Sequence, residues 1–243
     1  MIVLLRSILF SIVFFGGTFL LSAAGVLVAP FARGRLIDFA LAWARLGLWS
    51  ARVLCDIRVE VSGLENLPPG PALIASRHQS AFDTMVWFTL VPRCCYVMKQ
   101  ELLRIPLMGT LIAAAGMIAV DRDGGARTIR ALVKDGKRAV AAGKQIVIFP
   151  EGTRADPGAL LPLQPGVAAL AAATGLPVIP VLTDSGLVWG RRAFHKYPGT
   201  IHIVIRPAIP TGLRRDALMK RLRQELETEI QVAGQPVDKS VGR

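Results

Sequence analysis

Hydrophobic positions divide the chain into two parts. Residues 7–32 carry no charge, and this run is longer than the roughly 20 apolar residues that a helix needs to cross a hydrocarbon core. Beyond residue 56 the apolar residues come in short runs separated by longer, mixed segments. The pattern predicts a membrane anchor with an interfacial helix over 1–56, a folded domain over 57–232 and a frayed tail over 233–243.

The N-terminal part allows more than one course. Gly16, Gly17 and Pro30 permit a bent or re-entrant segment instead of a straight span. A cleaved signal peptide is the alternative, but the apolar run is too long for a usual signal, so we expect a retained anchor. Residues 36–55 mix apolar and charged positions and contain two tryptophans, which is typical of a helix at the bilayer surface. A helix packed on the following domain fits that segment equally well.

Positive charge favours one orientation of the anchor. Arg6 alone precedes the apolar run, whereas arginines at 33, 35, 45 and 52 follow it. Because positively charged flanks stay in the cytoplasm, we expect the C-terminal domain on the cytoplasmic side.

Residues 57–232 predict an α/β domain. Short buried-looking runs predict strands at 57–62, 72–76, 94–99, 116–121, 145–149, 178–182 and 201–206. Helical segments are expected at 82–90, 102–115, 126–142, 166–174 and 213–232. This alternation favours a central, largely parallel sheet with helices on both faces.

Composition narrows the classes of partner. The net charge of +12 suits nucleic acid, an anionic bilayer surface or a phosphorylated substrate. Basic residues are spread along the chain and only 7% of residues are aromatic, so a nucleic-acid platform is not expected. The three cysteines match no zinc pattern, and we expect buried thiols and no metal.

His78 and Asp83 are the first candidate for chemistry. On one regular helix, five steps of about 100° would put these side chains roughly 140° apart. They meet only if His78 ends a strand and Asp83 lies in the first turn of the next helix. The carboxylate would then accept one ring N–H and leave the other nitrogen to take a proton from a hydroxyl. A purely structural histidine is the alternative.

Further polar residues follow other predicted strands. Lys99, Arg122 and residues 151–154 each lie at or just after such a strand end, as does His78. Ligands of parallel sheets bind outside the carboxyl ends of the strands, so these residues predict one shared site. An ion pair of Arg122 with Asp121 or Asp123, and a solvated Lys99, are the alternatives.

Two motifs resemble the glycerolipid acyltransferase family. His78 and Asp83 match its H-x-x-x-x-D signature, and the second signature, (F/P)-P-E-G-(T/S)-R, is matched by Phe149, Pro150, Glu151, Gly152, Thr153 and Arg154. The resemblance runs from about residue 70 to residue 182 and is greatest to bacterial members that acylate 1-acyl-glycerol-3-phosphate. It implies an enzyme of the bacterial inner membrane that takes a lysophospholipid acceptor and an acyl thioester of acyl carrier protein or coenzyme A, with no other cofactor.

The resemblance also implies roles for residues. His78 would be the general base and Asp83 its orienting partner. Lys99, Arg122 and residues 149–154 would bind the glycerol phosphate, with Glu151 pairing with Arg154, Arg122 or an acceptor hydroxyl. No nucleophilic serine or cysteine is needed, so we expect direct transfer, with backbone N–H groups near His78 stabilising the oxyanion.

Departures from the family pattern leave alternatives open. Arg77 stands where many members have Asn, which would affect the choice of acceptor or acyl donor, and Ala119 stands where an aromatic residue is common. The alternatives are another acceptor such as a lyso-aminolipid, thioester hydrolysis, and a basic membrane-anchored binding protein without activity. His195 and His202 lack a motif, and we expect neither to be catalytic.

Overall fold

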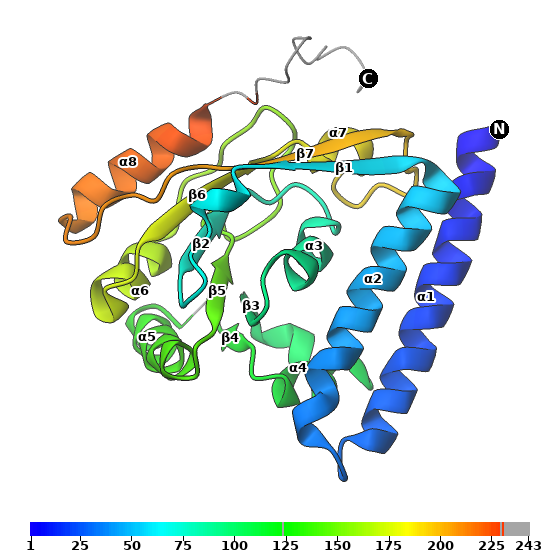
Figure 1. The fold of residues 1–243 in the computed structure, drawn as a ribbon, viewed down its shortest axis with the longest axis horizontal. Coiled ribbons are helices and arrows are strands. Elements are labelled where there is room, and N and C mark those ends of the chain that lie inside the picture. The colour runs from blue at the N-terminus through cyan, green and yellow to red at the C-terminus, as the bar shows by residue number, and fades with distance from the viewer. Residues whose placement is uncertain (123, 229, 231–243) are drawn as a thin grey trace.

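The computed structural model describes residues 1–122, 124–228 and 230. The expected tail over 233–243, and the end of the domain predicted before it, lie outside these residues. Figure 1 shows a sheet with helices on either side and a long helical hairpin along one flank.

Within the described residues, seven strands form one sheet in the order β1-β7-β6-β2-β5-β3-β4. The strands are β1 Ile57–Ser62, β2 Leu73–Ser76, β3 Cys94–Lys99, β4 Ile118–Val120, β5 Gln145–Ile148, β6 Val178–Thr183 and β7 Gly199–Ile205. Only the β6–β7 pair is antiparallel, so β2 to β6 all run in one direction. The prediction of a largely parallel sheet is confirmed, and the carboxyl ends of these five strands share one rim.

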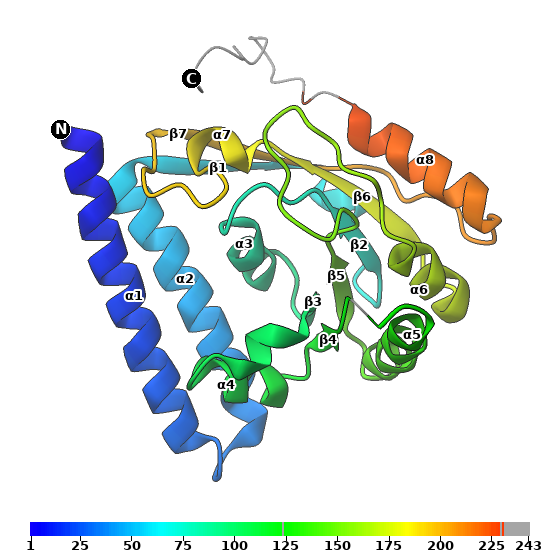
Figure 2. The ribbon, with the colours of Figure 1, turned by 180° about the vertical axis from the view of Figure 1, so that it is seen from behind.

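Helices cover both faces of the sheet (Figures 1 and 2). On one face lie α5 Ala126–Ala141, α6 Gly166–Thr174 and α8 Arg215–Glu227. Their buried Leu132, Leu170 and Leu222 share a hydrophobic cluster with β2, β5 and β6. The other face carries α3 Asp83–Leu90, followed outward by the N-terminal hairpin, and Met85 and Trp87 of α3 belong to a second cluster. The expected three layers are therefore present.

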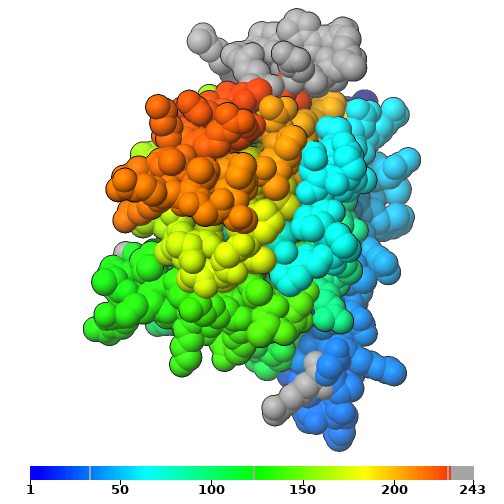
Figure 3. Space-filling view, turned by 60° about the vertical axis from the view of Figure 1, so that its left-hand side comes forward, coloured from blue at the N-terminus to red at the C-terminus, as the bar shows by residue number. Residues whose placement is uncertain are grey.

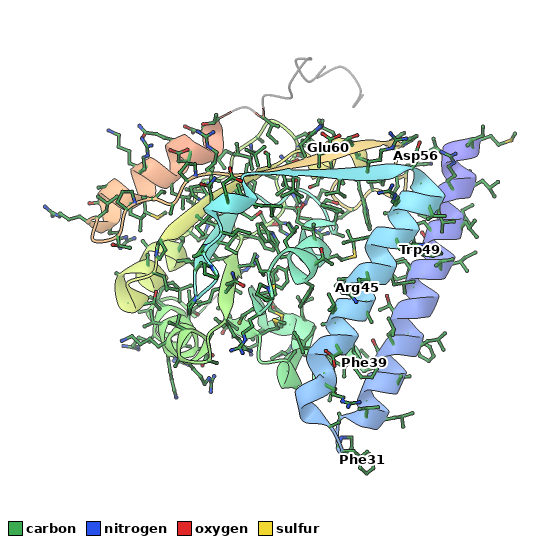
Figure 4. All side chains as sticks on the ribbon, in the orientation of Figure 1. Phe31, Phe39, Arg45, Trp49, Asp56 and Glu60 are labelled. Carbon is green, nitrogen blue, oxygen red and sulfur yellow. The ribbon has the colours of Figure 1, made fainter. Side chains whose placement is uncertain are left out.

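The N-terminal hairpin consists of α1 Ile2–Val28 and α2 Leu36–Cys55. The indole N–H of Trp43 donates a hydrogen bond to Oγ1 of Thr18 at 3.0 Å, which joins the two helices near their middle. α1 continues through Gly16 and Gly17, so these glycines do not bend it. Figure 3 shows the hairpin tip projecting beyond the body, and Figure 4 places Phe31, which is 89% exposed, at this tip.

The hairpin packs closely on the domain. The backbone N–H of Lys196 donates to Oγ of Ser7 at 3.0 Å near the start of α1, and Gly25 near its end approaches the side chain of Leu111. α2 buries Ala44 and Gly47 against the body. The outward face of α1 is apolar and exposed, and by length and composition this helix could cross a membrane.

The prediction of a single helix over 102–115 is wrong. A 3₁₀ helix, Gln100–Arg104, is followed by a separate helix, α4 Met108–Ala114. Pro106 cannot donate to a continuing helix, and Leu107 has a φ of +63°, which turns the chain sharply. Smaller differences lie at element ends, as for α8 and β4. Short helices that periodicity cannot detect occur at Arg33–Arg35, at Leu64–Asn66 and, as α7, at Ser185–Val188.

Gly47 provides a test of the hairpin's packing. A Cβ atom there would overlap Sδ of Met85 and lie 2.9 Å from Cε2 of Phe14, whereas Gly16 in α1 has open space. We predict that Gly47→Ala lowers the free energy of unfolding by about 1–3 kcal/mol through overpacking. The control, Gly16→Ala, should raise it by about 0.5–1 kcal/mol because alanine favours a helix. Denaturation in detergent measures both, and equal effects would contradict the packing described.

Candidate active site

His78 and Asp83 meet as their spacing predicts. β2 ends at Ser76 and α3 begins at Asp83, so the chain turns between the two side chains. Nδ1 of His78 lies 3.0 Å from Oδ2 of Asp83, and the two side chains are 12% and 3% exposed. This geometry can hold the proton of a neutral ring on Nδ1 and leave Nε2 as the nitrogen that accepts a proton.

Backbone groups fix the carboxylate of Asp83. The N–H groups of Gln79 and Ser80 donate to the same Oδ2 at 2.7 and 2.8 Å. The hydroxyl of Tyr96 donates to the backbone carbonyl of Asp83 at 3.3 Å. Because Asp83 occupies both of these N–H groups, neither is free for an oxyanion, and the expectation stays a prediction for other backbone N–H groups near His78.

The ring of Phe149 stacks on the ring of His78. The two ring centroids lie 4.0 Å apart at an interplanar angle of 16°. Phe149 directly follows β5, which is the neighbour of β2 in the sheet. Stacking and the Asp83 hydrogen bond together restrict both the tilt and the rotation of the imidazole.

His78 lines a cavity of about 780 Å³. Around His78, polar and cationic residues from the ends of three further strands line it: Lys99, Arg122, Gly152, Thr153 and Arg154. The predicted convergence at the carboxyl rim is confirmed for these residues, but Glu151 does not line the cavity. The rest of the wall is mainly apolar and includes Phe14, Phe39 and Trp43 of the hairpin. The cavity thus joins a cationic mouth to an apolar interior.

The cations at the mouth are partly desolvated. Burial lowers the pKa of Arg122, and Glu101 opposes this shift. Burial also lowers the pKa of Arg154, with Asp83 opposing the shift and Arg191 and Arg192 adding to it. Such guanidinium groups are stabilised by an anionic ligand.

Arg191 and Arg192 were missed by the sequence analysis. Both line the cavity, from the loop that follows α7. They belong to no motif, and the only signal is a pair of adjacent arginines between two apolar segments.

The turn at Pro150 and Gly152 shapes the rim. Gly152 has a φ of +71°, a left-handed conformation that favours glycine, and its N–H donates to the carbonyl of Phe149 at 2.9 Å. The carbonyl of Pro150 accepts the N–H of Gln164 at 2.7 Å. Pro150 therefore fixes the loop, whereas Gly152 and Thr153 line the cavity.

Glu151 pairs with neither Arg154 nor Arg122, so two of the three partners expected for it are wrong. Its Oε1 lies 3.9 Å from Nε of the buried Arg77, and its Oε2 accepts the N–H of Leu161 at 3.3 Å. The end of β5 and the turn after it direct this carboxylate away from the cavity, so Glu151 does not line it.

Arg77 likewise points away from the cavity. Its guanidinium donates to the carbonyls of Ala159 and Leu226, the latter at 3.5 Å. Arg77 therefore ties β2 to α8 and to the loop after Glu151. It does not line the cavity, and the expectation that this position affects the choice of acceptor or acyl donor stays a prediction.

A second histidine–aspartate pair lies outside the cavity. Nδ1 of His202 in β7 lies 2.7 Å from Oδ2 of Asp184, and Nε2 lies 3.7 Å from Glu60 in β1. Burial raises the pKa of Asp184, and His202 opposes this. Neither residue lines the cavity, so the pair braces the antiparallel side of the sheet.

The fold and the site together define a class of protein. A carboxylate-oriented histidine sits where a cationic mouth meets an apolar cavity, at the carboxyl rim of a largely parallel sheet. This arrangement defines an α/β enzyme for substrates that are both apolar and anionic.

Comparison with known proteins specifies the class further. Residues 58–184 match the family model described as Acyltransferase. The 1-acyl-sn-glycerol-3-phosphate acyltransferase of Pseudomonas aeruginosa is 36% identical over 93% of this chain and 89% of its own. The alpha enzyme of that name from Homo sapiens is 30% identical over 90% of this chain and 80% of its own. The chain therefore belongs to the acyltransferase family, and it is an O-acyltransferase.

A solved structure has the same fold. The crystal structure of the 1-acyl-sn-glycerophosphate acyltransferase PlsC from Thermotoga maritima aligns with a TM-score of 0.67 at 23% identity. The alignment covers 93% of this chain and 94% of that one, so it includes the N-terminal hairpin as well as the sheet.

Arg77 and Glu151 form a buried pair whose removal we expect to be costly. Arg77→Met leaves the Glu151 carboxylate without its cation and should lower the free energy of unfolding by about 3–5 kcal/mol. The double variant with Glu151→Gln should recover much of this loss, because no buried charge then remains. Chemical denaturation of the four proteins measures the cycle, and strictly additive losses would contradict the pairing.

The same pair predicts a pH dependence. Burial raises the pKa of Glu151, while the hydrogen bond from Leu161 and the charge of Arg77 oppose the shift. The folded state then binds this proton more tightly than the unfolded state, so stability falls as pH rises from about 4.3 toward the raised pKa. Without Arg77 the ionised form is penalised more. The destabilisation by Arg77→Met should therefore be larger at about pH 8 than at about pH 5.

Proposed function

We propose that the protein transfers an acyl group from a thioester to the sn-2 hydroxyl of 1-acyl-glycerol-3-phosphate, giving phosphatidic acid. The observation that carries this proposal is the position of His78 and Asp83, between the cationic side chains of the rim and the apolar part of the cavity. The names of the relatives support the choice of acceptor. The acyl chain fits the apolar interior, and the phosphate fits the cations at the mouth.

His78 acts as the general base. Nε2 takes the proton of the acceptor hydroxyl while the oxygen attacks the thioester carbonyl, and Asp83 stabilises the resulting imidazolium. As the tetrahedral intermediate collapses, the carbon–sulfur bond breaks and the thiolate takes the proton from Nε2. The new ester bond and the free thiol balance the bonds broken. Base catalysis of this kind contributes roughly 10²–10⁴-fold, and no acylated protein forms.

Lys99, Arg122 and Arg154 hold the phosphate of the acceptor near His78. The three side chains come from the ends of β3, β4 and β5, which lie on one side of β2 along the rim. Thr153 and Gly152 complete this wall. The donor is the thioester of either acyl carrier protein or coenzyme A, since both present the same acyl and pantetheine groups.

The hairpin places the cavity at a membrane. Its exposed apolar residues include Ile12, Phe15 and Phe19 of α1, each more than 60% exposed. Because α2 packs antiparallel to α1 and the body lies along both, a complete crossing by α1 would carry charged residues of α2 into the bilayer. We therefore place the hairpin in one leaflet, at the cytoplasmic face of a bacterial inner membrane.

Replacement of His78 tests the function. Wild-type protein in detergent should convert 1-acyl-glycerol-3-phosphate and an acyl thioester to phosphatidic acid, and His78→Ala should lower kcat/KM on the order of a thousandfold. His202→Ala is the matched control, because it removes the other aspartate-bonded histidine, and it should retain kcat/KM within a few fold.

Three outcomes would contradict the proposal. Full activity of His78→Ala would show that His78 is not the general base. Acyl release without an acceptor would make the protein a thioesterase. A lyso-aminolipid preferred over 1-acyl-glycerol-3-phosphate in an acceptor panel would reassign the substrate.

The membrane placement predicts an effect of charge on α1. The double variant Ile12→Asp, Phe19→Asp should lose most of its retention on phospholipid vesicles, because carboxylates are costly in an apolar layer. The control Leu213→Asp, Ala217→Asp adds the same charge near α8, on the opposite face of the sheet, and should bind as wild type. Vesicle flotation measures the retention of both variants. Equal retention would contradict the placement of the hairpin in one leaflet.

A further inference from the structure

The loop that follows α7 forms a second cationic wall of the cavity. Arg191 and Arg192 are exposed at its surface and line the cavity together with His78 and Arg154. α7 follows β6, which lies on the opposite side of β2 from β5, β3 and β4. Lys99 and Arg122 therefore approach the catalytic pair from one side of the rim, and this loop approaches it from the other.

Arg191 and Arg192 have no ion-pair partner in the part of the chain that the structure describes. Among the residues that the structure describes, no carboxylate lies within ion-pair distance of Arg154, Arg191 or Arg192. Arg191 and Arg192 also add to the lowering of the Arg154 pKa, which places three like charges in one electrostatic neighbourhood. Unpaired guanidinium groups at a cavity mouth repel one another and are stabilised by an oxyanion such as phosphate.

The loop is held in place by contacts on both sides. The backbone N–H of Tyr197 donates to the carbonyl of Val188 at 2.9 Å, and the ring of Trp189 meets Phe10 of α1 edge-on at 5.0 Å. The buried Lys196 donates its N–H to Ser7 of α1. Arg192 has a φ of +56°, a conformation that is strained outside glycine and concentrates in functional loops. The hairpin and α7 thus fix where the arginines stand.

We infer that Arg191 and Arg192 bind a phosphate group of a substrate from the side of the rim opposite Lys99 and Arg122. The inference rests on the proposed function, which brings two phosphate-bearing substrates to one histidine. The phosphate belongs either to the lysolipid acceptor or to the pantetheine arm of the thioester donor. Cations on both sides of His78 match a reaction in which both substrates carry phosphate.

Steady-state kinetics test the inference. Arg191→Gln with Arg192→Gln should raise the KM for one substrate by about tenfold or more, with a smaller change in kcat, because charge-assisted contacts to phosphate are lost. Arg191→Lys with Arg192→Lys should show a smaller rise, because positive charge remains. The control, Arg214→Gln with Arg215→Gln, removes two adjacent exposed arginines at α8, on the far face of the sheet seen in Figure 3, and should leave both KM values unchanged.

Phosphate-free substrates identify the source of the phosphate. If the acceptor supplies it, the difference between wild type and the glutamine variant should vanish with monoacylglycerol as acceptor. If the donor supplies it, the difference should vanish with an acyl-pantetheine thioester and return with acyl-phosphopantetheine. Either pattern supports the inference.

Other patterns would overturn it. Unchanged KM values for both substrates, a fall in kcat alone, or weaker binding to anionic vesicles with unchanged KM in detergent would each assign the arginines another role. Calorimetric binding of glycerol 3-phosphate and coenzyme A provides a readout without turnover. Wild-type protein should bind one of them about tenfold more tightly than the glutamine variant does. If wild type binds neither more tightly, this inference fails, whereas binding without acyl transfer would count against the proposed function instead.

Discussion

The hydrogen bond between His78 and Asp83 is the interaction around which the site is arranged. One carboxylate oxygen accepts the ring N–H and two backbone N–H groups of the turn between β2 and α3. The aspartate also lies in the first turn of α3, where negative charge is favoured. A strand end and a helix start thus fix the ring and its tautomer, and Phe149 stacks on the ring from the neighbouring strand.

The order of the strands then sets what surrounds this histidine. β2 lies in the middle of the sheet, so the ends of β5, β3 and β4 bring cations from one side and the loop beyond β6 brings them from the other. The N-terminal hairpin supplies apolar wall, because α2 packs on α3 and α1 contacts the Lys196 loop. The same hairpin therefore closes the cavity and presents an exposed apolar face outward.

Much of this could be predicted from sequence. The elements at 36–55, 57–62, 94–99 and 166–174 begin and end as expected, because their apolar runs are bounded by charge, glycine or proline. The meeting of His78 with Asp83 required a turn between a strand and a helix, and the sequence pattern predicted that strand at 72–76 and that helix at 82–90. The helix over 102–115 was wrong because Pro106 and the strained Leu107 outweigh a continuous apolar pattern. The Arg77–Glu151 pair depends on contacts with Ala159 and Leu226, which local sequence does not contain. Arg191 and Arg192 were missed because only the course of the chain after α7 brings them to the cavity.

The tautomer of His78 reports directly on its hydrogen bond to Asp83. ¹⁵N NMR of the histidine ring nitrogens, in wild type and in Asp83→Asn, reports which nitrogen carries the proton of the neutral ring. In wild type the hydrogen bond to Asp83 should place the proton on Nδ1 and leave Nε2 bare, and this preference should be lost in Asp83→Asn. A proton on Nε2 in wild type, or an unchanged spectrum in the variant, would contradict this role of Asp83.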